Sequence, residues 1–535
     1  MLSVKSRLAS AYARITLTRT TTAFFLFAFL HCFAQGIIQS FLFSLDAEYN
    51  ALLSSVTAVA EIPRRNLTYF EGTSGDLRLY MCDNIPSVVS GLLNRDPCET
   101  IFASGVDSNG PLVAKHRQLI TEDRFSKGLT ISPIRDPITR NTTGVTLASG
   151  TNSLILSKQC TQTLFYPQQI TRSSMREDLT FVFLQFWLFS ISLVAVLNDS
   201  VPHTLAVLAT RALVTAWSAF AVWRTPYIQE KLTEMIFEDG TPCAVDLWPE
   251  YWRVRAGYEI PDLILNLTAL VIASYLSATL LRDYSAQSFQ CVGAPQHITR
   301  INKFFMAVLA VLQLEAFVLI AAMGLWIDVL INTSIAQISS HTPAYKGCFI
   351  ITTVVSHYHE SCSSHGSRWD ALQGWYAIRR EMRVLMGVFL GISGLFLTLW
   401  SIMFYSIVYR WTFIEWPYLA CFTVASLMLI LASIVLGVVC RMNFGKGLKQ
   451  YLHAEAALAS SNFAPEVFAH DEEKGKMYDG LDVDEKVPAT FEAPRTPPPP
   501  PAATWGRPVQ YPQPIHVAFT QQLGSGHQVP YNVRC

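Results

Sequence analysis

The sequence predicts an all-α, multi-pass membrane bundle that carries a small exoplasmic α+β domain and ends in a disordered tail. Three observations lead to this fold class. Charged residues make up 15% of the 535 residues, whereas soluble globular chains carry about 25%. The apolar residues gather in runs of membrane length. Lysine and arginine cluster in short segments beside particular runs, which is typical of a chain with a fixed orientation in a membrane.

Seven apolar runs are long enough to cross a bilayer, because a spanning helix needs about 20 mostly apolar residues. We expect helices because a helix pairs the backbone groups of a run within the run itself. The predicted spans are residues 22–45, 180–197, 203–223, 258–281, 304–331, 384–408 and 417–440.

The first run follows a basic segment, residues 1–21, as a secretory signal requires. Cys32-Phe33-Ala34 fits a small-residue cleavage site, which leaves a cleaved signal peptide as an alternative. The run continues well beyond that point and exceeds the apolar core of a usual signal peptide, about 7–15 residues. We therefore predict an uncleaved signal anchor.

The basic clusters predict the orientation of the chain. Residues 1–21 are basic and the loop 282–303 holds Arg282, Arg300 and Lys303, so both are expected in the cytoplasm. Residues 46–178 then form the exoplasmic domain. Seven spans would leave the C-terminus outside, although basic clusters flank the last two spans: Arg379, Arg380, Arg383, Arg441, Lys446 and Lys449. One additional crossing before residue 379 places every cluster in the cytoplasm.

The candidate for this crossing is split into two apolar halves, residues 344–355 and 371–378. The polar segment 356–370 between them does not suit a helix exposed to lipid. We therefore predict eight intended spans, the sixth of which is interrupted, within a transmembrane bundle of residues 179–441.

Several stretches resemble an uncharacterised family of multi-pass membrane proteins from mushroom-forming fungi and their relatives. They are TTAFFLFAFLHCFAQGIIQSFLF, VGAPQHITRINK, GLWIDVLIN, WYAIRREMR, RWTFIEW and CRMNFGKGL, within residues 20–450. The family has no assigned activity, so the resemblance implies an architecture and not a function. It also implies one continuous helix where this chain has the two halves.

Residues 356–370 are predicted to arise from a mis-assigned coding sequence. Their removal joins the two halves into one helix of about twenty residues. Val355-Ser356 is compatible with the codons GTG-AGT, which resemble the start of a retained intron. The alternative is a genuine exoplasmic loop whose His357, His359, Cys362 and His365 suit Zn²⁺ or Cu. We expect no metal and no other cofactor.

The exoplasmic domain is expected to be glycosylated and cross-linked. Asn66 and Asn141 begin glycosylation sequons, whereas the sequon at Asn332 lies close to the membrane. Four cysteines share the exoplasmic side: Cys82, Cys98, Cys160 and Cys243. They allow two disulfides in three possible pairings, or leave one or more thiols free.

The C-terminal tail, residues 442–535, loses the apolar pattern and gains charge and proline, which favours disorder. Its proline run, residues 496–501, is expected to form an extended left-handed helix. Such a helix suits the aromatic groove of an SH3 or WW domain, although a plain spacer is the simpler interpretation. Zero net charge gives no reason to expect a nucleic-acid partner; the expected environment is the lipid bilayer.

Charged residues inside the spans are the candidate functional groups, because a charge in lipid is costly. Arg211 and Glu315 lie at matching depths and are predicted to pair. The favoured interpretation is a structural ion pair, or an Arg211 side chain that extends toward an interface; the alternative is a pair that gates protons or binds a charged solute. Glu259, Asp262 and Asp328 are expected near the exoplasmic surface, as an acidic vestibule or as plain interfacial residues. His31 is expected to make a packing hydrogen bond.

No nucleotide-binding loop, GxSxG or HExxH motif occurs, so we expect no enzyme and no catalytic residue. The favoured interpretation is a receptor-like sensor or a membrane organiser, located in the plasma membrane or a secretory-pathway membrane. The alternative is a transporter or channel that uses Arg211 and Glu315. The ligand and the oligomeric state are not predicted.

Overall fold

The computed structural model describes residues 2–62, 67–73, 75–89, 92–94, 98–104, 129–149, 152–238, 241–244, 248, 250–290, 295–333, 335, 381–448 and 450. All of these belong to one compact unit, Met1–His453. Its described part holds seven helices that are long and apolar enough to cross a membrane. The predicted fold class is confirmed, and the chain is a multi-pass membrane protein.

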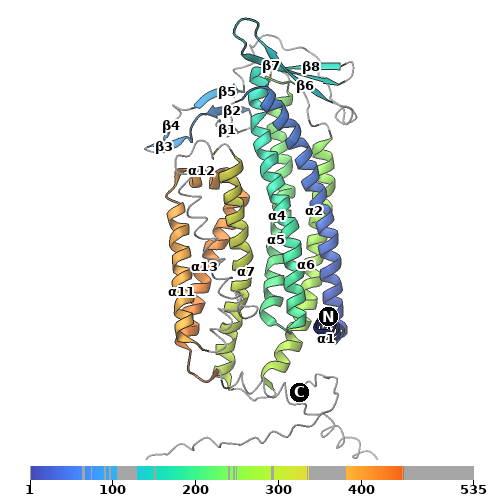
Figure 1. Cartoon of the computed structure of the whole chain (residues 1–535), viewed down its shortest axis with the longest axis vertical. Helices are drawn as coiled ribbons and strands as arrows, with labels where there is room; N and C mark the ends of the chain where they lie inside the picture. Colours follow the sequence, from blue (N-terminus) through green and yellow to red (C-terminus); the bar gives the residue numbers. More distant parts are fainter. Residues whose placement is uncertain are drawn as a thin grey trace, which may run out of the picture. The chain divides into compact units, whose positions relative to one another are not determined.

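The long helices run side by side (Figure 1). They are α2 (Arg19–Val59), α4 (Phe165–Leu197), α5 (Val201–Leu232), α6 (Tyr251–Gln290), α7 (Gln296–Asn332), α11 (Arg383–Met403) and α13 (Pro417–Met442). Shorter helices are α1 (Leu2–Ile15), α3 (Lys158–Thr163), the π-helix η3 (Thr233–Phe237) and α12 (Ile407–Glu415).

Several helices extend beyond the apolar runs that predict them. α2 has 41 residues, which is about 60 Å at 1.5 Å per residue, and it continues 14 residues past the predicted end at Leu45. The extension mixes polar and apolar residues, and Tyr49, Leu53 and Val56 recur every three or four residues and are buried. This stripe packs against the strands, which explains why the helix persists outside the apolar run.

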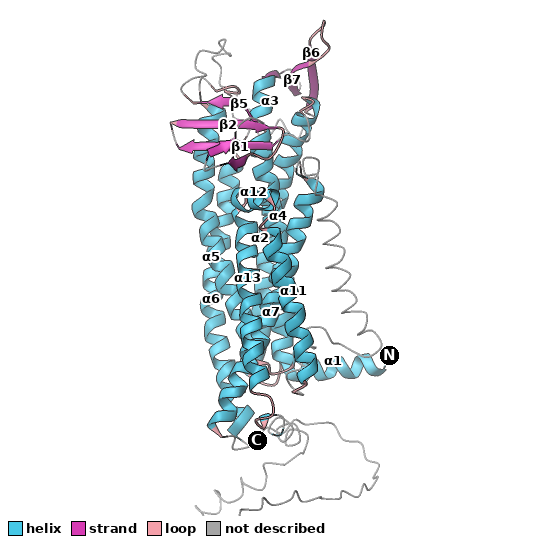
Figure 2. Ribbon diagram, turned by 90° about the vertical axis from the view of Figure 1, so that its left-hand side faces the viewer, coloured by secondary structure: helices cyan, strands magenta, loops and turns pink. Residues whose placement is uncertain are grey.

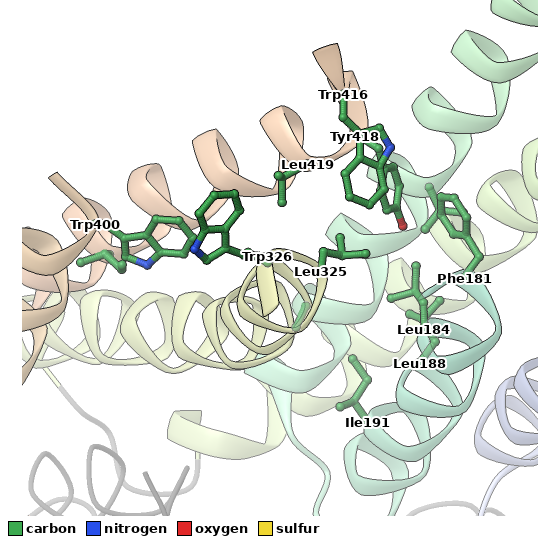
Figure 3. Close-up of a cluster of buried hydrophobic side chains, with 14 of the residues drawn as sticks. Phe181, Leu184, Leu188, Ile191, Leu325, Trp326, Trp400, Trp416, Tyr418 and Leu419 are labelled. Carbon is green, nitrogen blue, oxygen red and sulfur yellow. The ribbon is translucent and has the colours of Figure 1, made fainter. Parts of the chain in front are cut away.

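The helices form two groups according to their contacts. The four-helix group consists of α2, α4, α5 and α6: α2 contacts α4 and α6, while α5 contacts the same two helices. The three-helix group consists of α7, α11 and α13. A shared hydrophobic core joins the groups: Phe181, Leu184, Leu188 and Ile191 of α4 belong to the same cluster as Leu325 and Trp326 of α7 (Figure 3).

The predicted α+β domain is present as small antiparallel sheets, and we call β1–β8 with α3 the sheet domain. One sheet has the order β1-β2-β5 and another the order β6-β7-β8, while β3 and β4 form a hairpin. The strands are β1 (Leu67–Thr73), β2 (Asp76–Cys82), β3 (Ser87–Val89), β4 (Leu92–Asn94), β5 (Cys98–Ala103), β6 (Thr130–Arg135), β7 (Thr142–Ser149) and β8 (Asn152–Ser157).

Glu61, directly after α2, fastens the second sheet to the four-helix group. Its carboxylate accepts a hydrogen bond from Arg135 Nη2 in β6 at 2.8 Å and another from Thr142 Oγ1 in β7 at 2.8 Å. The sheets lie at one end of the helices and α1 at the other (Figure 2). We call these the sheet end and the basic end, since Arg383 and Arg441 lie at the latter, where Arg441 donates to the Arg383 carbonyl.

The chain direction of α7 and α11 bears on the eighth crossing. Phe305 and Val308, near the start of α7, pack with Met386, near the start of α11. The two helices are therefore parallel, so α7 ends at the sheet end whereas α11 begins at the basic end. The interrupted span at 344–355 and 371–378 lies outside the described residues and stays a prediction, but the flanking helices agree with it. The tail after residue 450 also lies outside them.

Candidate functional site: a layered polar interior

The interior of the four-helix group is polar, and its inward-facing side chains recur every seven residues on all four helices, all of them polar in the outer and middle layers. Seven residues are about two helical turns, or about 10 Å along the axis, so this spacing stacks the side chains in layers. The outer layer, nearest the sheets, is Asp46, Asp178, Thr225 and Arg255. The middle layer is Gln39, Gln185, Ser218 and Asp262. The inner layer is Cys32, Ser192, Arg211 and Ala269. All of these except Cys32 are buried.

In the outer layer, the Arg255 guanidinium is enclosed by carboxylates. Its Nη1 donates to Asp46 Oδ2 at 2.6 Å, and its Nε donates to Glu259 Oε1 at 2.7 Å. Tyr251 donates its hydroxyl proton to Asp46 at 2.8 Å, and Thr225 donates to Glu259 at 2.9 Å. Asp46 has no exposed surface and Arg255 retains 5%, so this is a desolvated ion-pair cluster whose hydrogen bonds offset part of the desolvation cost.

Neighbouring ion pairs join the two helix groups at the same level. Arg224 of α5 donates to the Glu177 carboxylate of α4 through its two terminal guanidinium nitrogens, Nη1 at 3.2 Å and Nη2 at 2.8 Å. The indole of Trp416, before α13, donates to the same carboxylate at 2.9 Å. Arg176 of α4 forms a salt bridge with Asp328 of α7. A change in the outer layer is therefore connected to the three-helix group through α4.

In the middle layer, the Asp262 carboxylate accepts four hydrogen bonds from neutral side chains. Gln39 Nε2 donates to Oδ1 at 2.6 Å, and Gln35 Nε2, one turn along α2, donates to the same oxygen. Ser218 Oγ donates to Oδ2 at 2.7 Å and Asn266 Nδ2 at 3.1 Å. No lysine or arginine among the described residues forms an ion pair with this carboxylate.

Glu259 and Asp262, predicted near the exoplasmic surface as an acidic vestibule or as interfacial residues, are buried between the helices and do not line an open vestibule. Both keep only 5% of their surface exposed. The reason is rotational: they lie on the stripe of α6 that faces the other three helices, which sequence depth alone does not reveal. Asp328 is paired with Arg176 and is not part of an acidic vestibule with them.

Arg211 and Glu315 have different partners in the structure. The Arg211 guanidinium contacts His31 Nδ1 at 3.1 Å and lies over the Phe27 ring, 5.0 Å from its centroid. Glu315 of α7 lies beside the Ser433 hydroxyl of α13, in the three-helix group. No ion pair joins Arg211 and Glu315 in the described part of the chain. His31 does make the hydrogen bond expected of it.

The four cysteines form two disulfides: Cys82–Cys98 lies within the sheet domain, and Cys160–Cys243 joins α3 to the loop before α6. The first joins residues that face each other across β2 and β5. Asn141 is exposed beside the β6–β7 turn, where an oligosaccharide has room; Asn66 lies outside the described residues. A hollow of about 330 Å³ opens beside the first sheet and is lined by Asp76, Arg78, Tyr80, Cys98, Thr100, Ala103 and Ser104.

Sequence reasoning did not find Gln35, Gln39, Gln185, Ser218 or Asn266, because an amide or a hydroxyl in a span is a weak signal by itself. The available signal was spacing along each helix: Gln39 and Gln185 are seven residues from Asp46 and Asp178, while Gln35 and Asn266 are four residues from Gln39 and Asp262. Such spacing marks one face of a helix. The described residues contain no cluster of histidine, cysteine and acidic side chains suited to a metal ion. The cluster from His357 to His365 lies outside them.

The chain was also compared with known proteins. No protein-family model matches it, and neither a curated protein nor a solved structure does.

Proposed function

We propose that the protein is a receptor-like membrane sensor without catalytic activity. Its exoplasmic part is the sheet domain, and its responding element is the four-helix group. The observation that carries this proposal is one continuous hydrophobic core, which joins the sheets to the ends of all four helices.

The core draws on each of these elements. α2 contributes Tyr49, Leu53 and Val56, and the beginning of α4 contributes Leu164 and Phe165. Other buried members come from the strands, from the end of α5, from η3 and from the start of α6 with the residue Trp248 before it: Leu77, Leu79, Met81, Ile101, Phe102, Val145, Leu147, Leu156, Leu232, Met235, Ile236, Phe237, Trp248 and Tyr251. Close-packed cores transmit displacement instead of absorbing it, so a ligand that moves the sheets moves the helix ends.

The outer and middle layers supply a two-state element for such a sensor. A buried hydrogen-bond network has only a few arrangements in which every donor and acceptor is paired. A small rotation of one helix therefore replaces one set of hydrogen bonds in these layers by another. The hollow beside β1, β2 and β5 is the candidate ligand site. Its Asp76, Arg78 and Tyr80 suit a polar or charged ligand, although the ligand itself is not identified.

Hydrogen–deuterium exchange on the full chain in lipid nanodiscs tests this proposal. A nanobody selected to cover the hollow serves as the probe. We expect altered exchange in the sheets and also at the basic ends of α2 and α6. In Arg255→Met, where the outer layer is broken, the effect at the basic end should disappear while the sheets still respond. Exchange changes confined to the sheets of the unaltered protein would contradict the proposal.

A transporter is the second candidate, and the polar interior of the four-helix group favours it. The described interior is tightly packed, however. The small hollow between α4, α5 and α6, next to Thr225 and Arg255, measures about 10 Å³, which is room for about one water molecule. Accumulation of a labelled solute in proteoliposomes, lost in Asp262→Asn, would replace the sensor proposal with a transporter.

A further inference from the structure

The middle layer contains a buried carboxylate without a cationic partner. Asp262 is 5% exposed, and its four hydrogen-bond donors, from Gln35, Gln39, Ser218 and Asn266, are all neutral. An ionised carboxylate inside a membrane bundle is costly, and such groups mark paths or sites for ions and protons. The surroundings of Asp262 therefore need a positive charge that the described side chains do not supply.

The same layer has a surplus of amide groups. Among the described residues, the Oε1 atoms of Gln35 and Gln39 have no hydrogen-bond partner, and both amide atoms of Gln185 lack one as well. These three side chains are at most 5% exposed. Buried polar atoms in native proteins are nearly always partnered, so several unpartnered atoms in one layer indicate a ligand that is polar and small.

Amide rotation connects the two observations. Rotating the terminal amide of a glutamine by half a turn exchanges the positions of its oxygen and nitrogen, and the shape of the side chain hardly changes. If Gln35 and Gln39 turn, their carbonyl oxygens occupy the positions from which the nitrogens now donate to Asp262. Carboxylate, carbonyl and hydroxyl oxygens would then converge from three helices. Without a cation these oxygen atoms repel one another, and a cation bound among them stabilises the arrangement.

The chemistry of the oxygens selects the ion. A set of only oxygen ligands suits hard cations, and Ca²⁺ sites typically draw on several carboxylates. Here one carboxylate is joined by neutral oxygens, which balances a single positive charge. We propose that the middle layer binds a sodium ion through Asp262, Gln35, Gln39 and Ser218.

Thermal unfolding of the full chain in phosphatidylcholine nanodiscs tests the site, with NaCl compared with choline chloride at equal ionic strength. An ion that binds only the folded state raises the melting temperature in a saturable manner. We expect this rise in NaCl, a smaller one in KCl, and none in Asp262→Asn. Equal melting temperatures in NaCl and choline chloride would overturn the proposal. A rise in KCl as large as the rise in NaCl would overturn it as well.

Two further variants keep the test decisive if Asp262→Asn fails to fold. Gln39→Met keeps the length of the side chain but removes its oxygen, and it should weaken the apparent sodium affinity about tenfold, the scale of one lost bond to an ion. Glu315→Gln alters a buried carboxyl group in the other helix group and should keep the full sodium response. Unchanged affinity in Gln39→Met, or a lost response in Glu315→Gln, would contradict the assigned site.

Discussion

At the scale of single residues, Arg255 is the cation that pairs with the buried carboxylates of the outer layer. It contacts the carboxylates of Asp46 and Glu259 and the Tyr251 hydroxyl. Arg255→Ala leaves two buried carboxylates unpaired, so we expect a loss of about 3–5 kcal/mol in the free energy of unfolding. Thermal or denaturant unfolding in detergent measures this loss.

Arg253 provides the matched control on the same helix. It pairs with Glu250 but keeps most of its side chain exposed, and exposed ion pairs contribute about 0–1 kcal/mol. Arg253→Ala should therefore leave the protein nearly as stable as before. Equal losses in the two variants would show that the Arg255 cluster is solvated and not a buried network.

The partners of Arg211 give a second prediction at this scale. Because Arg211 contacts His31 and Glu315 lies in the three-helix group, the stability effects of Arg211→Ala and Glu315→Ala should add within about 0.5 kcal/mol. The cycle of Arg211→Ala with His31→Ala should instead show coupling. A double-mutant cycle of unfolding free energies decides the matter, and coupling between Arg211 and Glu315 would restore the pair predicted from the sequence.

At the scale of elements, the Cys160–Cys243 disulfide links the start of the α3–α4 segment to the loop before α6. It spans 83 residues of sequence, whereas Cys82–Cys98 spans 16. A cross-link that closes a longer loop removes more entropy from the unfolded chain. We expect a loss of about 2–5 kcal/mol for Cys160→Ser with Cys243→Ser, and a smaller loss for Cys82→Ser with Cys98→Ser.

Thermal unfolding of the two double variants measures these losses, and non-reducing electrophoresis checks that the remaining disulfide is formed. The Cys82–Cys98 pair is the natural control, because the strands it joins are also held by backbone hydrogen bonds. An equal or larger loss for that pair would mean that local strand pairing, and not loop closure, governs the stability of the sheet domain.

At the scale of the whole molecule, glycosylation tests the orientation of the chain. Asn141 is exposed at the sheet end, so it should carry one oligosaccharide if that end is exoplasmic. Asn141→Gln is then expected to remove one endoglycosidase-sensitive step in electrophoretic mobility. Asn332→Gln is the control: Asn332 donates to Asp328 at the end of α7 and should stay unmodified. An unchanged mobility for Asn141→Gln would argue that the sheets do not face the exoplasmic side.

The sequence alone determined the parts of this protein that depend on local composition. Seven spanning helices follow from apolar runs, because partition into lipid is a property of each run by itself. The four cysteines of the disulfides were identifiable in the same way, although three pairings remained possible. The charged residues of the spans were visible too, because a charge within an apolar run stands out by itself.

Only the tertiary structure decided which of these groups meet. Disulfide pairing depends on β2 lying beside β5. The partner of Arg211 depends on its side chain reaching His31 of α2, although α5 also packs against α7. The depth of a residue in the membrane can be predicted from its own helix. The residues that it contacts depend on which helices pack against each other. The four-helix interior around Asp262 therefore arises from packing: four helices turn their polar stripes toward one another because lipid gives those stripes no hydrogen-bond partner.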